Sequence, residues 1–459
     1  MTIGAVDDVV KQDTLAGSKA KFDLLRLVGV RAVRISEIWA PGLQAPTADQ
    51  QRILTNVTGA AQLAGVDVYA SVYNASLTTT PLSDKDQSDF AAYTAALVRK
   101  NPSITHVVVG NEPNLNRFWM PQYGLDGSDV AAPAYESLLA TTYDALKAVN
   151  PQITVIGGAV SPRGVDKPNT GRDTHSPVTF IPDMGAAYKA SGRTKPIMDM
   201  FAFHGYQDNS SIAPGTPHPN PASKNVTIAD YTRLTGLLGQ AFDGTAQPGS
   251  TLPIDYGEFG VESKIPADKA SLYTGTELPA TKPVDETTQG LYYRQALALA
   301  FCQPTVNAFF FLHAVDESDL NRWQSGFYYA DGTPKSSLPA VQKAIRDVRA
   351  GVITRCPGMQ LTPKATIVYP KGAALTRTPL TLTITCDIDC NYYVRLVRLP
   401  RKSPTLAVSG RAASGAATRI KLPARKVAPG RYQLTVRLTA PVNVGPPLKD
   451  SSPPFRIPR

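Results

Sequence analysis

Eight short runs of β-branched and apolar residues alternate with longer segments of helical periodicity between residues 1 and 350. This alternation is typical of parallel sheets, because neighbouring parallel strands need a helix-sized connection. The runs predict strands over Thr2–Val6, Ala32–Ser36, Val66–Val72, His106–Val109, Ile153–Ile156, Met200–His204, Leu252–Tyr256 and Ala308–Leu312.

A helical segment follows every predicted strand. The segments are Lys19–Leu27, Asp49–Leu63, Asp86–Arg99, Pro133–Val149, Phe180–Ala190, Ile228–Phe242, Asp285–Phe301 and Leu338–Ala350. Eight such units favour a closed barrel over an open doubly wound sheet, and no Gly-x-Gly-x-x-Gly turn follows the first strand. The sequence therefore predicts an α/β fold, a (β/α)8 TIM barrel over residues 1–350.

The sequence pattern changes after Arg349, where short alternating runs with Pro and Gly turns replace the helical periodicity. We expect a linker over residues 351–360 and a small all-β sandwich over residues 361–459. The residues from Ser451 onward are expected to form a loose end. The predicted strands are Ala365–Tyr369, Leu380–Cys386, Tyr392–Leu399, Arg419–Leu422 and Tyr432–Leu438.

The charge is concentrated in this second domain. Residues 360–459 hold 17 Lys and Arg against three acids, a balance of +14, so a chain of net charge +10 leaves −4 for the rest. Such a domain could bind an anionic polymer such as an acidic polysaccharide. The alternative is a sandwich that only packs against the barrel and stabilises it. No basic motif interleaved with aromatic residues is present, so nucleic acid is not an expected partner.

The four cysteines favour disulfides, Cys386 with Cys390 and Cys302 with Cys356, over reduced buried thiols. A zinc site is disfavoured, because no second cysteine pair has finger spacing. Disulfides suit a secreted or cell-surface protein, and we expect that a signal peptide preceded this sequence. No apolar run reaches the roughly 18 residues of a membrane span, so none is expected.

Two glutamates occur where the fourth and seventh strands are expected to end. Residues 110–114 read Gly-Asn-Glu-Pro-Asn and residues 255–260 read Asp-Tyr-Gly-Glu-Phe-Gly. Catalytic groups of such barrels lie at the carboxyl ends of the strands, and strands four and seven face each other across the barrel mouth. Two facing carboxyl groups are the arrangement that glycoside hydrolysis requires, because one protonates the departing oxygen and the other attacks the sugar or activates water. Alternatively, Glu112 caps the next helix and Glu258 is an ordinary surface acid.

Asn-Glu-Pro after the fourth strand and Glu after the seventh resemble the clan A (4/7 superfamily) retaining glycoside hydrolases, especially families 39 and 5, over residues 1–350. The resemblance implies a glycosidase that cleaves an oligosaccharide, polysaccharide or glycoside by double displacement through a covalent glycosyl-enzyme. It makes Glu112 the acid/base, Glu258 the nucleophile and Asn111 a partner of the sugar 2-hydroxyl. No cofactor or metal is expected.

The same resemblance assigns residues around the nucleophile. Arg34, at the second strand, would keep Glu258 ionised, although it could instead pair with Glu37. His204 and Tyr206 follow the sixth strand, and the tyrosine hydroxyl would contact the nucleophile. The alternative for His204 is a histidine packed in the core.

The tryptophans Trp39, Trp119 and Trp323 follow the second, fourth and eighth predicted strands. All three are expected on the catalytic rim, framing a sugar cleft, because sugar C–H faces pack on aromatic rings. Ordinary loop packing is the alternative.

Two other functions fit the sequence less well than a glycosidase. A catalytically inactive carbohydrate-binding barrel would have no use for both Glu112 and Glu258. A metal-dependent hydrolase would need a His/Asp ligand set at the strand ends, which the sequence does not supply.

Overall fold

The computed structural model describes residues 1–220, 222–353, 363–371, 379–386, 390–400, 403–413, 415–423, 427–439 and 447–457. The chain divides into two compact units, Met1–Val352 and Ile353–Arg459. From residue 354 onward, the predicted linker lies outside the described residues.

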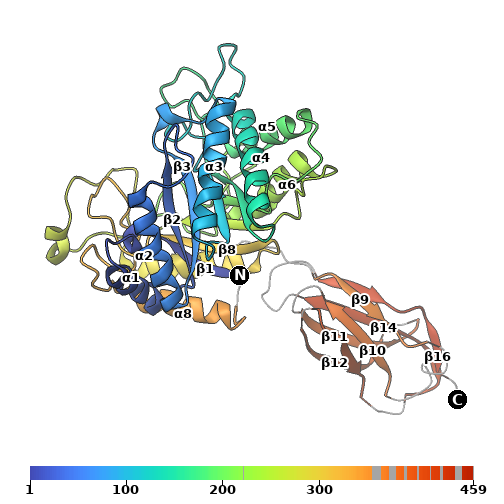
Figure 1. The fold of residues 1–459 in the computed structure, drawn as a ribbon. Helices are drawn as coiled ribbons and strands as arrows, with labels where there is room; N and C mark the ends of the chain where they lie inside the picture. Colours follow the sequence, from blue (N-terminus) through green and yellow to red (C-terminus); the bar gives the residue numbers. More distant parts are fainter. Residues whose placement is uncertain are drawn as a thin grey trace. The chain divides into compact units, whose positions relative to one another are not determined.

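Eight parallel strands close into a barrel in chain order, and β8 pairs with β1 (Figure 1). The strands are β1 (Thr2–Val6), β2 (Ala32–Trp39), β3 (Asp67–Asn74), β4 (His106–Val109), β5 (Thr154–Val160), β6 (Met200–His204), β7 (Ile254–Phe259) and β8 (Val306–Leu312). The predicted barrel is confirmed. However, β2, β3, β5 and β7 extend two to four residues beyond their predicted ends, so Trp39 and Glu258 lie within strands.

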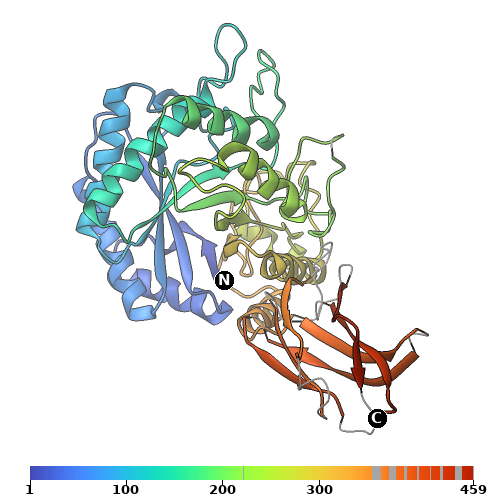
Figure 2. The ribbon, with the colours of Figure 1, turned by 90° about the vertical axis from the view of Figure 1, so that its right-hand side faces the viewer.

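Helices connect these strands on the outside of the barrel, which Figure 2 shows for the blue to green segments. They are α1 (Leu15–Val28), α2 (Ala48–Ala64), α3 (Asp84–Lys100), α4 (Ala131–Val149), α5 (Pro177–Ala190), α6 (Tyr231–Phe242), α7 (Glu286–Cys302) and α8 (Leu338–Arg349). Short 3-10 helices are η1 (Asp8–Val10), η2 (Leu77–Thr79), η3 (Ile228–Asp230) and η4 (Ala267–Leu272).

The barrel interior is packed with side chains rather than open. Strand residues that point inward, such as Tyr69, Ile156, Met200 and Phe310, form one buried cluster. Because this core fills the interior, a ligand has access only at the barrel ends, and the loops after the strands form the end at which such barrels carry their sites.

The second unit is a sandwich of two antiparallel sheets. Its strands are β9 (Ala365–Val368), β10 (Thr381–Cys386), β11 (Cys390–Arg398), β12 (Ser403–Ala412), β13 (Thr418–Lys421), β14 (Gly430–Thr439), β15 (Leu448–Ser451) and β16 (Phe455–Ile457). One sheet has the order β13-β10-β9, and the other has β12-β11-β14-β15, with β16 also pairing with β14. Residues of both sheets, including Ile384 and Leu434, share one core.

The predicted all-β domain is confirmed, but the prediction missed β12, β15 and β16. The expected loose end after Ser451 was wrong, because Phe455 pairs with Tyr432 and is buried. β15 has four residues and β16 has three, too few to stand out from the Pro-rich segments around them. β12 has ten residues, but its Pro, Ser and Gly residues weaken the strand pattern.

The predicted disulfide between Cys386 and Cys390 is confirmed and joins β10 to β11. The other predicted pairing involves Cys356, which lies outside the described residues. Within the described residues, no helix combines the length and the apolar character needed to cross a bilayer.

Candidate active site

The segment after β4 brings Glu112 into the barrel mouth through unusual backbone angles. Gly110 has a φ of 84° and Glu112 a φ of 40°. A side chain at Gly110 would place its Cβ 2.9 Å from the Tyr135 ring, and the Glu112 amide donates to the Ala159 carbonyl at 2.9 Å. A positive φ at a non-glycine residue costs energy and is concentrated at functional sites, so the conformation of Glu112 is itself a functional signal.

A register shift between β6 and β7 aims Glu258 at the same point. Ala202 pairs with Asp255, whereas His204 pairs with Glu258, so β7 contains one extra residue over this interval. Irregularities of this kind re-aim side chains beside active sites. At Gly257, a Cβ would lie 3.0 Å from Arg34 Nη1, so glycine allows the guanidinium to approach β7 closely.

Both carboxylate oxygens of Glu258 accept hydrogen bonds. Arg34 Nη2 donates to Oε1, and the Tyr206 hydroxyl donates to Oε2 at 2.7 Å. Burial would raise the pKa of Glu258, but the positive charges of His204 and Arg34 and the bonds from Tyr206 and Arg34 outweigh burial and hold the pKa below its ordinary value. Glu258 is therefore an oriented, ionised carboxylate.

His204 lies between the two glutamates. Its Nδ1 is 2.9 Å from Glu112 Oε1 and 3.5 Å from Glu258 Oε2, and its Nε2 is 3.4 Å from Arg34 Nη1. Nδ1 thus faces the carboxylates of both glutamates, and Nε2 faces the Arg34 guanidinium.

The Oε2 atom of Glu112 has no hydrogen-bond partner within the described part of the chain, and the side chain is 14% exposed. Neighbouring Asn111 is partly exposed, and its side chain likewise has no partner among the described residues. One oxygen of Glu112 is thus fixed by His204, while the other and the Asn111 amide remain available to a ligand.

The structure brings together five of the predicted site residues: Glu112, Glu258, Arg34, His204 and Tyr206. Arg34 pairs with Glu258 and not with Glu37, whose carboxylate is 3.1 Å from Lys11 Nζ.

The tryptophans depart from the prediction. Trp39 is fully buried against Phe90 and donates to the Leu43 carbonyl, and Trp119 is 2% exposed and packs edge-on against Tyr135. Neither presents an indole face to a ligand, so the expectation that they frame a cleft was wrong for both, because β2 and the β4–α4 loop turn these rings into the core. Trp323 is partly buried and stacks on Tyr206, with ring centroids 4.9 Å apart.

Two buried residues of the same sequence motifs, Asn114 and Asp255, also belong to the site, although the sequence assigned a role to neither. Buried Asn114 accepts from the Ser161 amide and donates to the carbonyls of Ser161 and His175, which fixes the loop beside Glu112. Asp255 is fully buried, and neither of its carboxylate oxygens has a hydrogen-bond partner within the described part of the chain. Residues two positions apart lie on the same face of a strand, so Asp255 and Gly257 share one face of β7. This spacing is the sequence signal that places Asp255 inside the barrel.

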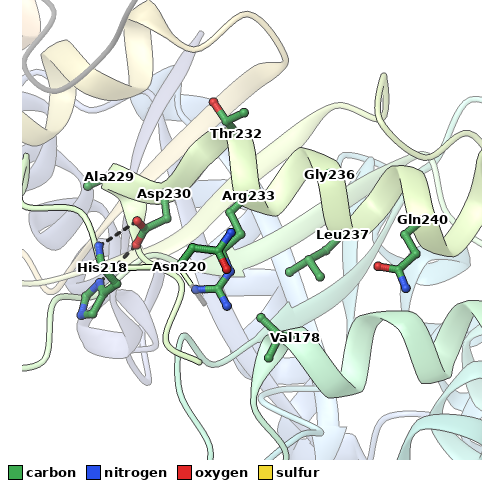
Figure 3. A pocket seen from close by; sticks show the side chains of 10 residues that line it. All are labelled: Val178, His218, Asn220, Ala229, Asp230, Thr232, Arg233, Gly236, Leu237 and Gln240. Atoms are coloured by element: carbon green, nitrogen blue, oxygen red, sulfur yellow. Dashed lines mark hydrogen bonds and ion pairs between the residues drawn. The ribbon is translucent and has the colours of Figure 1, made fainter. Parts of the chain in front are cut away.

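A cavity of 630 Å³ lies elsewhere, beside α6, and Figure 3 shows His218, Asp230 and Arg233 among its lining residues. Neither glutamate lines it, nor do Arg34, His204 and Tyr206. His218 is held between Asp230 and Asp208. Among the described residues, no group of three or more His, Cys, Asp or Glu side chains could hold a metal ion.

A scan against protein-family models and a search of curated protein sequences found no match. Solved structures do match in fold. GH5_18 from Streptomyces cattleya in complex with GlcNAc aligns with a TM-score of 0.51 at 16% identity, over 79% of this chain and 83% of that one. A variant of that protein in complex with Manb1-4GlcNAc gives 0.50 at 16% identity, over 79% and 83%.

A GH39 beta-xylosidase from Caulobacter crescentus aligns over 93% of both chains at 17% identity, with a TM-score of 0.48. The alignment with a calcium binding mutant of Bacteroides uniformis beta-glucuronidase 2 covers 99% of this chain at 13% identity, with a TM-score of 0.45. This chain spans 44% of the length of that protein. The predicted resemblance to family 5 glycoside hydrolases is confirmed at the level of the fold.

Proposed function

We propose that this protein is a retaining glycoside hydrolase in which Glu258 is the nucleophile and Glu112 the acid/base. The observation that carries this proposal is the asymmetry of the pair. Glu258 accepts from Arg34 and Tyr206 through both oxygens, whereas Glu112 is held by His204 through one oxygen only. One carboxyl is therefore kept ionised, and the other keeps an oxygen available for a proton.

In the first step, Glu258 attacks the anomeric carbon of the bound sugar. A C–O ester bond forms, the glycosidic C–O bond breaks, and the proton of Glu112 moves to the departing oxygen. In the second step, Glu112 takes a proton from water, the water oxygen attacks the anomeric carbon, and the ester breaks to free Glu258. Asn111 would bind the 2-hydroxyl beside the cleaved bond, and Trp323 would pack on the sugar.

The spacing of the carboxylates supports retention. Glu112 Oε1 and Glu258 Oε2 lie at 2.9 and 3.5 Å from the same nitrogen, so they are no farther apart than the sum of these distances. The roughly 5–5.5 Å between the carboxyl groups of retaining enzymes, which allows direct attack on the sugar, lies within this limit.

The substrate class is a glycoside or an oligo- or polysaccharide, in keeping with the sugars bound by the Streptomyces cattleya structures. The disulfide between Cys386 and Cys390 supports an exported protein, because disulfides persist in oxidising compartments.

A panel of aryl glycosides, read by chromophore release, tests the proposal. We expect turnover of at least one sugar by the full chain. A control is Glu136→Ala, which alters a carboxylate on α4 outside the glutamate pair and should retain activity. If no glycoside is turned over while one still binds, the chain is instead the inactive carbohydrate-binding barrel.

Substitution Glu112→Ala should have an effect that depends on the leaving group. Aryl glycosides with acidic phenols need little protonation and should still form the glycosyl-enzyme, whereas substrates with poor leaving groups should lose about 10²–10⁴-fold in kcat/KM. Rates measured across a series of phenols test this. Equal losses for all leaving groups would contradict the role of Glu112 as the acid.

A further inference from the structure

The outer face of the β12-β11-β14-β15 sheet carries an unusual set of charges. Side chains alternate between the two faces of a strand, and Val394, Leu396, Val436 and Leu438 point into the core. The residues between them point outward, and the strand pairing puts six basic residues on this side. These residues, hereafter the basic face, are Arg395, Arg411, Arg431, Arg437, Lys449 and Arg456.

Two pairs within the basic face oppose like charges directly. Arg437 pairs with Lys449 across β14 and β15, and Arg431 pairs with Arg456 across β14 and β16. Like charges opposite each other on neighbouring strands destabilise a sheet. The chain therefore keeps two unfavourable pairs that a single substitution in each would remove, which marks the face as functional.

A single acid accompanies these six basic residues on the described part of the sheet. Within the described residues of this unit, Asp450 is the one acidic residue; it pairs with Val436, is exposed and lines a cavity together with Arg395, Arg437 and Lys449, so the three basic side chains there outnumber it. Burial, followed by the nearby charge of Asp450, raises the pKa of the Tyr369 hydroxyl, which packs against the core. None of the six basic residues forms an ion pair with any described residue.

The face is also hollowed. Tyr393, Arg395, Arg437 and Lys449 line a cavity of 530 Å³. Tyr393 is 42% exposed, and the Arg395 guanidinium carbon lies over its ring, 5.6 Å from the ring centroid. Proteins that bind single-stranded nucleic acid stack successive bases on open aromatic rings, whereas here one side of Tyr393 is covered by Arg395.

We propose that the basic face binds an acidic polysaccharide, with Arg395, Arg437 and Lys449 on its carboxylates and Tyr393 against a sugar ring. The choice of a polysaccharide over another polyanion rests on the proposed glycosidase function of the barrel. The carboxylates of one bound polysaccharide molecule would neutralise the facing pairs of basic side chains, so binding would relieve the repulsion between strands of the sheet.

The test measures binding of the full chain to immobilised polygalacturonate, with its neutral methyl ester and single-stranded DNA as comparison ligands. We expect binding to polygalacturonate alone, weakened at least about tenfold between 50 and 300 mM NaCl by screening and counterion release. Tighter binding to the DNA would overturn the inference, as would the absence of salt-sensitive binding to polygalacturonate.

Arg437→Glu places an opposite charge across from Lys449, so the variant should unfold at the same temperature as the wild type or higher while binding at least about tenfold more weakly. Arg419→Glu makes the same charge change at an exposed position on β13 of the other sheet and should bind within about threefold of the wild type. Equal losses in both variants would show attraction by net charge without a site. Because no turnover is measured, these results are independent of whether the barrel is active.

Discussion

Substitution Glu258→Ala should abolish turnover of every glycoside that the wild type cleaves, with kcat/KM falling by at least about 10⁴-fold. The reason is that Glu258 would supply the bond to the anomeric carbon, and the Arg34 and Tyr206 groups that orient it cannot replace it. Release of the aryl chromophore measures the loss. Near wild-type rates in the variant would show that Glu258 is not the nucleophile.

Added azide gives this prediction a second readout. In Glu258→Ala a small anion can occupy the vacated position and attack once, so the product should be a glycosyl azide inverted relative to the substrate. In Glu112→Ala azide would instead attack the glycosyl-enzyme, and two displacements would give a retained azide. The same azide configuration from both variants would contradict the assignment of the two roles.

Asp255→Asn should make the protein more stable above neutral pH. Burial, partly offset by the charges of Arg34 and His204, raises the pKa of Asp255 from 3.8 to about 7. Between those values the folded chain keeps a proton that the unfolded chain has lost, so the free energy of unfolding falls as the pH rises. The fall amounts to roughly 4 kcal/mol, complete above pH 7 and absent below pH 4.

Melting temperatures measured from pH 4 to 8 test this expectation. The wild type and Asp255→Asn should melt close together at pH 4 and diverge toward pH 8, with the variant higher. Glu262, whose pKa burial also raises to about 7, acts in the same direction in both proteins and so does not affect the comparison. Asp268→Asn alters an exposed aspartate and should follow the wild type. Parallel curves for the wild type and Asp255→Asn would contradict a buried, unpaired Asp255.

The barrel could be predicted from the sequence because its signal is repeated. Each strand of a parallel barrel is buried on both faces and is an apolar run, such as β4 and β6, whose bounds match the prediction. The ends of β2 and β7 could not be predicted, because Glu37 and Glu258 interrupt the apolar pattern. Their polar side chains are accommodated by tertiary partners, Lys11 and Arg34, that no local pattern reveals.

A residue of the candidate site could be predicted from the sequence under two conditions. Its side-chain type had to suit one chemical role, and it had to lie at the end of a recognisable strand. Glu112 and Glu258 met both conditions. The tryptophans did not, because a position near a strand end does not say which way a side chain turns, and Trp39 and Trp119 turn into the core. The bridging position of His204 depends on the register shift between β6 and β7, which is a property of the pairing and not of either strand alone.

The configuration of the first-formed sugar tests the proposed mechanism most directly. With a substrate found in the aryl glycoside panel, proton NMR spectra recorded before mutarotation report the anomer that the enzyme releases. Two displacements at the anomeric carbon, first by Glu258 and then by water activated by Glu112, predict the anomer of the substrate. Release of the opposite anomer would require a single displacement by water and would contradict the assignment of Glu258 as a nucleophile.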